Sequence, residues 1–172
     1  MSKILVAYAT AAGSTGEVAE AIGNALREAG DTVDVCRAKE VTDLSGYDAV
    51  VFGSGVRAGK TYAEAAAFLG KHQAALSSLP VAGFIVCLTM KENTPDNCTQ
   101  AAAYVDAMFA SAPGVKLVGD KGLFAGQVDY KTLPWLLKFI LKRFIKEPGG
   151  DYRDFEAIRS WATSIRSALV GD

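Results

Sequence analysis

The chain has 172 residues, half of them hydrophobic, and a formal net charge of −1. This length suits one well-packed domain and is too short for two full ones. The near-neutral charge gives no sign of the basic surface that nucleic-acid binding requires, so we expect no nucleic-acid partner.

Strand-like and helix-like patterns alternate along the chain from its first residues to its last. Short apolar runs predict strands, and apolar residues at helical spacing predict helices. The strands are expected at residues 4–8, 32–36, 48–54, 81–88 and 115–124, and the helices at residues 14–29, 62–76, 100–109 and 152–169. Residues 39–47 are expected to form a loop.

This alternation predicts an α/β fold in which helices cover both faces of a parallel sheet. Five strands fit a doubly wound sheet of order 2-1-3-4-5 within a single domain, residues 1–172. In such sheets a ligand binds beyond the carboxyl ends of the strands, here between the first and third strands. The loops after the first, third and fourth strands should therefore share one site.

The first of these loops, Ala9–Glu17, lies between a strand and a helix. Ser14 followed three residues later by Glu17 matches a capping box, so we expect the helix to start at Ser14 with its side chain as the cap. A helix start offers unpaired amides, and the hydroxyls of Thr10, Ser14 and Thr15 surround this one. The loop contains no Lys or Arg, which favours a terminal phosphate monoester and hence a mononucleotide. An ordinary turn that binds nothing is the alternative.

The stretch after the third predicted strand, Gly53–Thr61, is also rich in glycine. Its Gly59-Lys60-Thr61 matches the second half of a Walker A loop, but Ser54 stands where the first glycine of that motif belongs. The spacing of Gly53, Gly55 and Gly59 is one residue longer than a dinucleotide fingerprint. A flexible glycine-rich connection is the third interpretation.

These motifs together carry a family resemblance. Thr10 to Thr15, with the loops at 54–59 and 87–90, resembles flavodoxins, which are small FMN-binding electron carriers. The loops at 53–59 and 91–95, with Lys138-Phe139-Ile140 and Gly149-Gly150-Asp151, are similar to flavodoxin-like protoporphyrinogen dehydrogenases of porphyrin biosynthesis, which pass electrons to menaquinone. The resemblance covers nearly the whole chain.

The resemblance implies FMN as the cofactor, with its phosphate held at residues 10–15 and its isoalloxazine ring bordered by residues 54–57 and 87–90. The implied cofactor-binding residues are Thr10, Ala11, Ala12, Gly13, Ser14, Thr15, Ser54, Gly55, Val56, Arg57, Gly59, Cys87, Leu88, Thr89 and Met90. It also implies an FMN-dependent oxidoreductase with a porphyrinogen as electron donor and a quinone as acceptor. A soluble electron shuttle and a flavin-free interaction module are the alternatives.

Two departures from the flavodoxin pattern concern the flavin site. Ala12 stands where flavodoxins commonly place a threonine. Residues 54–60 and 87–91 contain no aromatic side chain to stack on the ring, which favours a ring that a substrate can reach. Tyr62 and Phe124 are the aromatic candidates for reaching the ring. No side chain stands out as a catalytic acid or base, and Arg57 is the best candidate for a charge contact with flavin or substrate.

A basic amphipathic segment, residues 130–147, lies between the fifth strand and the last helix. Its apolar residues leave a narrow polar stripe near Lys131, Lys138, Lys142, Arg143 and Lys146. Such a helix can rest on an anionic membrane or roof a pocket for a large apolar acid. A helix packed on the sheet and an interface between identical subunits are the alternatives.

The remaining signals concern the cell compartment and metals. Cys36, Cys87 and Cys98 lack the even number and close spacing of a disulfide framework, and we expect them reduced. His72 alone cannot form a metal site, so we expect no metal and place this residue at the surface. The chain enters its first strand without a signal peptide, which predicts a cytoplasmic protein, with peripheral contact at the inner face of the membrane.

Overall fold

Helices and strands alternate along the chain as the sequence predicts. The computed structural model describes residues 1–11, 13–128, 134–140, 143 and 150–171. In chain order the elements are β1 (Lys3–Ala9), α1 (Ser14–Glu28), β2 (Thr32–Arg37), the short 3₁₀ helix η1 (Ala38–Glu40), β3 (Ala49–Arg57), β4 (Lys60–Thr61), α2 (Ala63–Leu76), β5 (Val81–Cys87), the 3₁₀ helix η2 (Leu88–Lys91), α3 (Pro95–Phe109), β6 (Gly122–Ala125), β7 (Gln127–Val128), α4 (Trp135–Ile140), β8 (Gly150–Asp151) and α5 (Phe155–Val170).

The main sheet is parallel along the path β2-β1-β3-β5-β6, which confirms the doubly wound order predicted for five strands. A sixth strand, β4, pairs antiparallel with the end of β3 and was not predicted. The glycine-rich loop expected after the third strand is therefore wrong, because β3 continues to Arg57 and the chain turns back through Ala58 and Gly59. Both turn residues have positive φ, 51° and 74°, as tight hairpin turns require.

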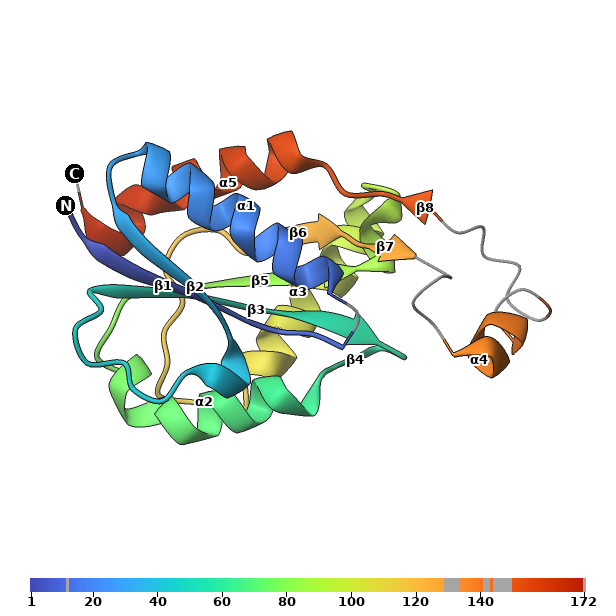
Figure 1. Ribbon diagram of the computed structural model, residues 1–172, viewed down its shortest axis with the longest axis horizontal. Coiled ribbons are helices and arrows are strands. Elements are labelled where there is room, and N and C mark those ends of the chain that lie inside the picture. The colour runs from blue at the N-terminus through green and yellow to red at the C-terminus, as the bar shows by residue number, and fades with distance from the viewer. Residues whose placement is uncertain (12, 129–133, 141–142, 144–149, 172) are drawn as a thin grey trace.

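Helices cover both faces of this sheet (Figure 1). α1 and α5 lie along one face, and α2 and α3 lie along the other. Each face has its own hydrophobic core, and the side chains of β1, β3 and β5 contribute to both. The apolar runs of β3 and β5 are buried over almost their full length, as expected for strands covered on both sides. Within the described residues, no helix combines the length and the apolar character that a bilayer crossing needs.

Two helix starts differ from the predicted ones because capping residues set them. α3 begins at Pro95, five residues before the predicted Gln100, and the Thr94 hydroxyl accepts a bond from the Asn97 amide at 3.2 Å. α5 begins at Phe155 instead of Tyr152, with the Asp154 carboxylate accepting from the Ala157 amide. The predicted inward faces are otherwise largely confirmed, and the buried residues are Ala101, Val105, Met108 and Phe109 in α3 and Ile158, Ala162, Ile165 and Leu169 in α5.

The fifth predicted strand, residues 115–124, is shorter in the structure. β6 covers Gly122–Ala125, and Leu117 forms an isolated bridge with Val81. The Phe124 ring is buried between Phe84 and Trp161, with centroid distances of 6.3 and 5.4 Å. Phe124 therefore belongs to the core and is not a ring-stacking candidate.

The surface position expected for His72 is wrong. This side chain is buried on the inner face of α2, where its ring packs against Phe68 at 4.9 Å. Its Nε2 lies 3.4 Å from the Val41 carbonyl oxygen, in the segment that follows η1. Lys71 and Gln73 on either side suggest an exposed position, but the fold turns His72 toward the sheet. The three cysteines are free thiols, as predicted.

The predicted amphipathic segment, residues 130–147, is described only in part. Residues 130–133, 141–142 and 144–147 lie outside the described residues. The described part forms α4, whose Trp135, Leu136, Phe139 and Ile140 are exposed to solvent. The alternative of a helix packed on the sheet is therefore wrong for these residues. β7 and β8, which precede and follow the segment in the sequence, pair antiparallel with each other.

Candidate functional site

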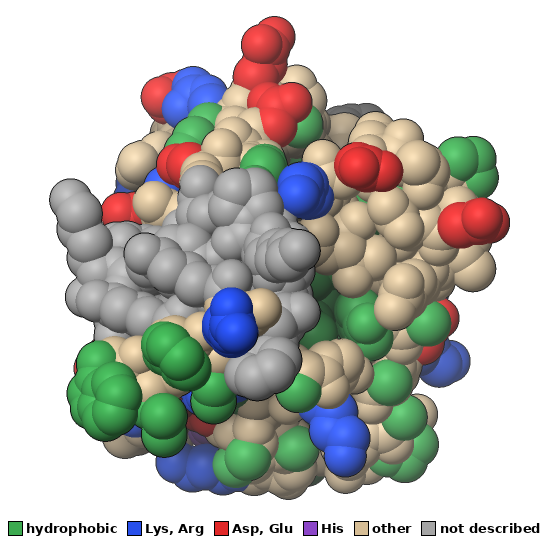
Figure 2. All heavy atoms as spheres, turned by 90° about the vertical axis from the view of Figure 1, so that its right-hand side faces the viewer, with side chains coloured by type: hydrophobic (Ala, Val, Ile, Leu, Met, Phe, Trp, Pro, Cys, Tyr) green, Lys and Arg blue, Asp and Glu red, His purple; other side chains and the backbone are tan. Residues whose placement is uncertain are grey.

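The strand register brings three loops to one edge of the sheet. Ala9, the last residue of β1, pairs with Ser54 of β3, and Ser54 pairs with Ile85 of β5. Because these strands are parallel, their carboxyl ends open onto the same side of the molecule. Figure 2 looks onto this end, which is the right-hand end of Figure 1. The loops after β1, β3 and β5 therefore come together as predicted.

The first loop ends at Gly13, which is the N-cap of α1. Gly13 has φ 89°, a left-handed conformation that favours glycine. A Cβ built on Gly13 would meet nothing within 4 Å. The helix starts at Ser14 as predicted, but the capping box is wrong, because no side chain caps this helix. Since Gly13 takes the cap position, Ser14 lies one residue too far along the helix to accept a capping bond.

The missing cap leaves hydrogen-bond donors at the start of α1. Among the described residues, neither the Ser14 amide nor the Thr15 amide has an acceptor. The Thr10 hydroxyl accepts from the Gly13 amide at 3.3 Å and keeps its own proton to donate. Two amides and the positive end of the helix dipole thus point out of the loop, an arrangement suited to an anion.

The other predicted residues of this loop differ in exposure. Ala11 and Gly13 are exposed, Ser14 is half-buried, and Thr15 is buried. Ala12 lies outside the described residues. Thr15 therefore lies deepest in the loop, against the end of β3.

Gly55 lies at the point where the first and second loops pack against each other. A Cβ built on Gly55 would lie 2.9 Å from the Thr15 hydroxyl oxygen and 3.0 Å from Cε2 of Tyr62. No side chain fits in this space, so glycine lets the backbone of β3 approach α1 closely. Tyr62, a half-buried residue just before α2, packs against the other side of the same position.

The remaining residues of the second loop belong to the β3–β4 hairpin. Ser54 is fully buried, and its hydroxyl donates to the Gly55 carbonyl at 2.7 Å and accepts from the Tyr62 amide at 3.4 Å. Val56 is half-buried, and Arg57 and Lys60, which pair across the hairpin, are exposed. Ser54 thus fastens the hairpin to α2, and the two cations stand at its tip.

This hairpin overturns the Walker A interpretation of Gly59-Lys60-Thr61. In a phosphate-binding loop the lysine and threonine open a helix. Here Lys60 and Thr61 form strand β4, and α2 begins only at Ala63, after an extended residue. The dinucleotide fingerprint fails for the same reason, because Gly59 occupies a hairpin turn and no helix starts there.

The third loop begins at Cys87 and continues through η2. Cys87 is buried at the end of β5, and burial raises the pKa of its thiol. Along η2, Leu88 is exposed, Thr89 is half-buried and Met90 is buried. Leu88 and Thr89 are thus the side chains of this predicted stretch that reach the surface.

Arg37, a residue that the sequence reasoning missed, braces the first loop. Its Nη2 donates to the Thr10 carbonyl at 2.7 Å and to the Glu64 carboxylate at 3.1 Å. Glu64 also accepts from the Lys39 amide at 3.1 Å. The sequence places Arg37 at the end of the strand beside β1, which could have marked it as a residue near the first loop. Its partner Glu64, 27 residues away, could not be predicted from the sequence.

Arg153, also missed, fastens the segment after β8 to the first helix. Its Nε and Nη2 donate to the Asp151 carboxylate at 2.8 and 2.7 Å, and its Nη1 donates to Glu17 in the first turn of α1. The guanidinium carbon lies 5.0 Å from the centroid of the Phe155 ring, and the Arg153 side chain is 8% exposed. The two carboxylates, Asp151 above all, raise the pKa of Arg153.

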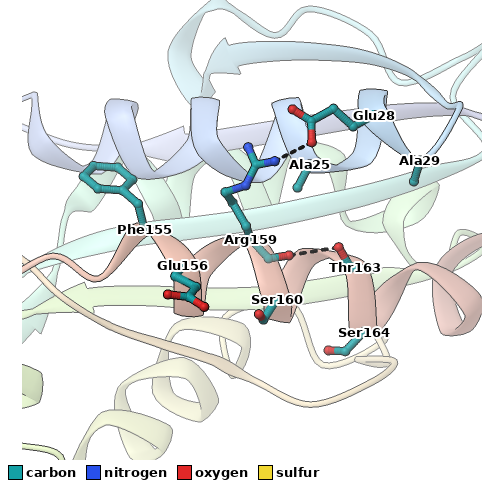
Figure 3. Close-up of a pocket in the computed structure, with 9 residues that line it drawn as sticks. All are labelled: Ala25, Glu28, Ala29, Phe155, Glu156, Arg159, Ser160, Thr163 and Ser164. Atoms are coloured by element: carbon teal, nitrogen blue, oxygen red, sulfur yellow. Dashed lines mark hydrogen bonds and ion pairs between the residues drawn. The ribbon is translucent and has the colours of Figure 1, made fainter.

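Two grooves lie beside the helices α1 and α5. The larger, about 810 Å³, runs between the two helices, with the Arg159–Glu28 ion pair across it (Figure 3). The second, about 550 Å³, reaches the end of the first loop at Gly13 and the first turn of α1 at Gly16, and is bordered by Tyr8. Residues of the second and third loops line neither groove. The larger groove is therefore separate from the edge where the three loops meet.

Comparisons with known proteins agree with this architecture. A family model described as a flavodoxin domain matches residues 5–154. The chain is 27% identical over 175 residues to a protoporphyrinogen IX dehydrogenase [quinone] from Escherichia coli (strain K12), covering 95% of this chain and 94% of that protein. A protein of the same name from Leishmania major is 26% identical over 176 residues, covering 95% and 74%. The solved structure of oxidised flavodoxin 1 from Bacillus cereus matches with a TM-score of 0.63 and 16% identity, covering 98% of this chain and 99% of that one.

Proposed function

This chain belongs to the flavodoxin domain family, and from that premise we propose that it is an FMN-dependent oxidoreductase that takes electrons from a porphyrinogen and passes them to a quinone. The observation that carries the proposal is the meeting of three loops at one edge, with two amides of α1 lacking acceptors among the described residues. The similarity in sequence to quinone-linked protoporphyrinogen IX dehydrogenases over almost the whole chain supports the choice of substrates.

The first loop fits the terminal phosphate of FMN. The amides of Ser14 and Thr15, with the hydroxyls of Thr10, Ser14 and Thr15, would hold the phosphate oxygens without a cationic side chain. Arg37 keeps the loop in place by binding the Thr10 carbonyl, so the loop is braced before the ligand arrives. The backbone beside Ala11, Ala12 and Gly13 would complete the cradle.

The hairpin and η2 would border the flavin ring. Gly55, Val56, Arg57 and Gly59 would lie along one side, and the stretch from Cys87 to Met90 along the other. When bound, the isoalloxazine supplies the chemistry, accepting electrons or hydride from one substrate and giving them to another. The protein would orient the ring and leave one face open to substrates, because neither stretch carries an aromatic side chain that would cover it.

Charges at the hairpin tip favour an acidic substrate. Arg57 and Lys60 face each other across the hairpin and are both exposed, so they can meet the carboxylates of a porphyrinogen. A quinone acceptor resides in lipid, so we also propose that the protein works at the cytoplasmic face of a membrane, as a peripheral protein. A homo-oligomeric state stays a prediction.

Flavin binding is tested by adding FMN to the purified protein and recording absorbance. Bound flavin gives absorbance bands at about 375 and 450 nm, and these bands elute with the protein in gel filtration. Thr15→Val should weaken binding, because it removes one donor to a charged ligand, worth about 1.5 to 3 kcal/mol. The matched control is Thr163→Val on α5, whose hydroxyl bonds the Arg159 carbonyl away from the three loops. Absence of flavin bands would favour a flavin-free module.

The substrate is tested by anaerobic mixing of the FMN-loaded protein with a porphyrinogen and a quinone. We expect porphyrin fluorescence to rise with one turnover of quinone reduction for each pair of electrons removed. Flavin that binds and cycles with a reductase, but oxidises no porphyrinogen and reduces no quinone, would make the protein an electron shuttle instead.

A further inference from the structure

Four large apolar side chains of α4 are exposed to solvent. Trp135 is 78% exposed, Leu136 55%, Phe139 59% and Ile140 39%. Elsewhere in the described residues the exposed large hydrophobic side chains are Met1, Leu88 and Phe155, which are scattered. Such a concentration in six residues marks an interaction surface, since scattered exposed hydrophobics are ordinary and a cluster is not.

The four side chains share one side of the helix. Their spacing, at positions i, i+1, i+4 and i+5, places them within an arc of about 140° at 100° per residue. In Figure 2, hydrophobic side chains gather at the lower left of this end of the molecule. We define these four residues as the α4 face.

Charge around the α4 face indicates what it meets. Residues 130–147 contain five basic residues and one acidic residue, while the whole chain has a net charge of −1, so the rest of the chain is acidic. Arg143, just beyond α4, is exposed. Exposed apolar side chains in a segment of net positive charge match an anionic lipid surface, where the ring of an exposed tryptophan settles among the headgroups.

Two other occupants fit less well. In a twofold contact between copies of this chain, α4 would meet α4, and the basic residues would face one another. A six-residue helix also offers less area than the roughly 800 Å² per partner of a standard protein interface. A lipid bilayer needs no matching shape and attracts the same charges.

The position of α4 turns the candidate site toward that surface. β6 ends beside β5, where Ala125 pairs with Cys87, and the chain then passes through β7 to α4. The Tyr152 amide donates to the Gly126 carbonyl at 3.2 Å, which fixes the return of the chain at the same edge. α4 therefore projects from the end of the molecule where the three loops meet (Figure 1).

We propose that the α4 face docks this protein on an anionic phospholipid bilayer and so holds its three-loop edge near lipid-dissolved quinone. The docking rests on the exposed residues and charge of this segment, whereas its purpose rests on the proposed function. Docking should occur with or without FMN, because no α4 residue belongs to the proposed flavin site.

The test uses the full chain and sedimentation with vesicles of phosphatidylcholine, with and without phosphatidylglycerol. We expect pelleting with the anionic vesicles at low salt and much less with the neutral ones. Replacing both Trp135 and Phe139 by serine should weaken binding about tenfold or more, through lost apolar burial. Both side chains are exposed, so the fold should survive. The matched control, Phe155→Ser, removes an exposed aromatic ring outside α4 and should bind as the wild type does.

A second readout separates lipid from a protein partner. The chain has two tryptophans, and Trp161→Phe leaves Trp135 as the reporter. Its emission should shift to the blue on adding anionic vesicles. No pelleting, or equal pelleting of the serine variant, would overturn the proposal, as would a dimer that the serine variant abolishes. Vesicle binding by a protein that takes up no flavin would leave this inference standing and refute the proposed function.

Discussion

Replacing Gly55 by alanine tests the close approach on which the candidate site depends. The new Cβ would lie 2.9 Å from the Thr15 hydroxyl oxygen and 3.0 Å from the Tyr62 ring. Thr15 is 2% exposed, so its side chain cannot swing outward. Overpacking of this kind costs about 1 to 3 kcal/mol. Displacing Thr15 also removes a proposed phosphate donor, so we expect FMN affinity to fall about tenfold or more.

Gly70→Ala is the matched control for this substitution. A Cβ on Gly70 meets nothing within 4 Å, and this residue lies inside α2. Alanine there should stabilise the protein by about 0.4 to 1 kcal/mol and leave FMN affinity unchanged. Urea unfolding without flavin measures the stability, and quenching of flavin fluorescence on binding measures the affinity.

A double-mutant cycle shows whether the cost comes from this contact. In a Thr15→Ala background the colliding oxygen is gone, so Gly55→Ala should cost less than it does in the wild type. Unfolding midpoints and FMN affinities of Gly55→Ala that match the wild type would refute the close approach of β3 and α1. Equal costs in the two backgrounds would mean that Thr15 is not the residue that Gly55 accommodates.

Two further predictions concern a shielded ion pair and a buried imidazole. Arg153→Met should lower the free energy of unfolding by about 1 to 3 kcal/mol, because it removes the hydrogen bonds of an arginine whose side chain is 8% exposed. Arg159→Met removes an arginine whose side chain is 46% exposed and should change the free energy of unfolding by less than about 1 kcal/mol. Equal losses of stability in urea unfolding would contradict this prediction. Burial lowers the pKa of His72, so its contribution should be complete above about pH 6.5 and be lost as the pH falls through the lower folded-state pKa. His72→Gln should therefore flatten the dependence of Tm on pH between about pH 5 and 7, and an unchanged slope would contradict the assignment.

The sequence predicts the sheet well because its central strands carry continuous apolar runs, residues 49–52 of β3 and almost all of β5. β3 and β5 are covered on both faces, so their buried stretches contain few polar residues. Chain connectivity and the rule of right-handed crossovers then leave few strand orders. The same reasoning locates the three loops, since it needs only the strand ends.

The sequence-based prediction was wrong at a helix cap, at a hairpin and at one buried side chain. The capping box at Ser14 has the correct residue types, but the left-handed Gly13 takes the cap position. The hairpin after β3 depends on Ala58, which adopts a positive φ that its residue type disfavours. His72 lies between polar neighbours, and only the packing of α2 against the sheet shows that it faces inward. The first two outcomes are local backbone conformations, whereas the burial of His72 depends on partners far away in the sequence.

The link between β6 and α5 is a suitable place for an added surface in this fold. β7 and β8 pair at its base, so the chain leaves and returns at one point, and the main sheet keeps its order. Arg153 then ties the returning strand to Glu17, in the first turn of the helix whose start would hold the phosphate. Because one arginine bonds both Asp151 and Glu17, the base of the segment and the proposed flavin site are held as one unit. If the proposed function holds, this tie anchors the base of the segment that carries α4 at the same edge as the flavin.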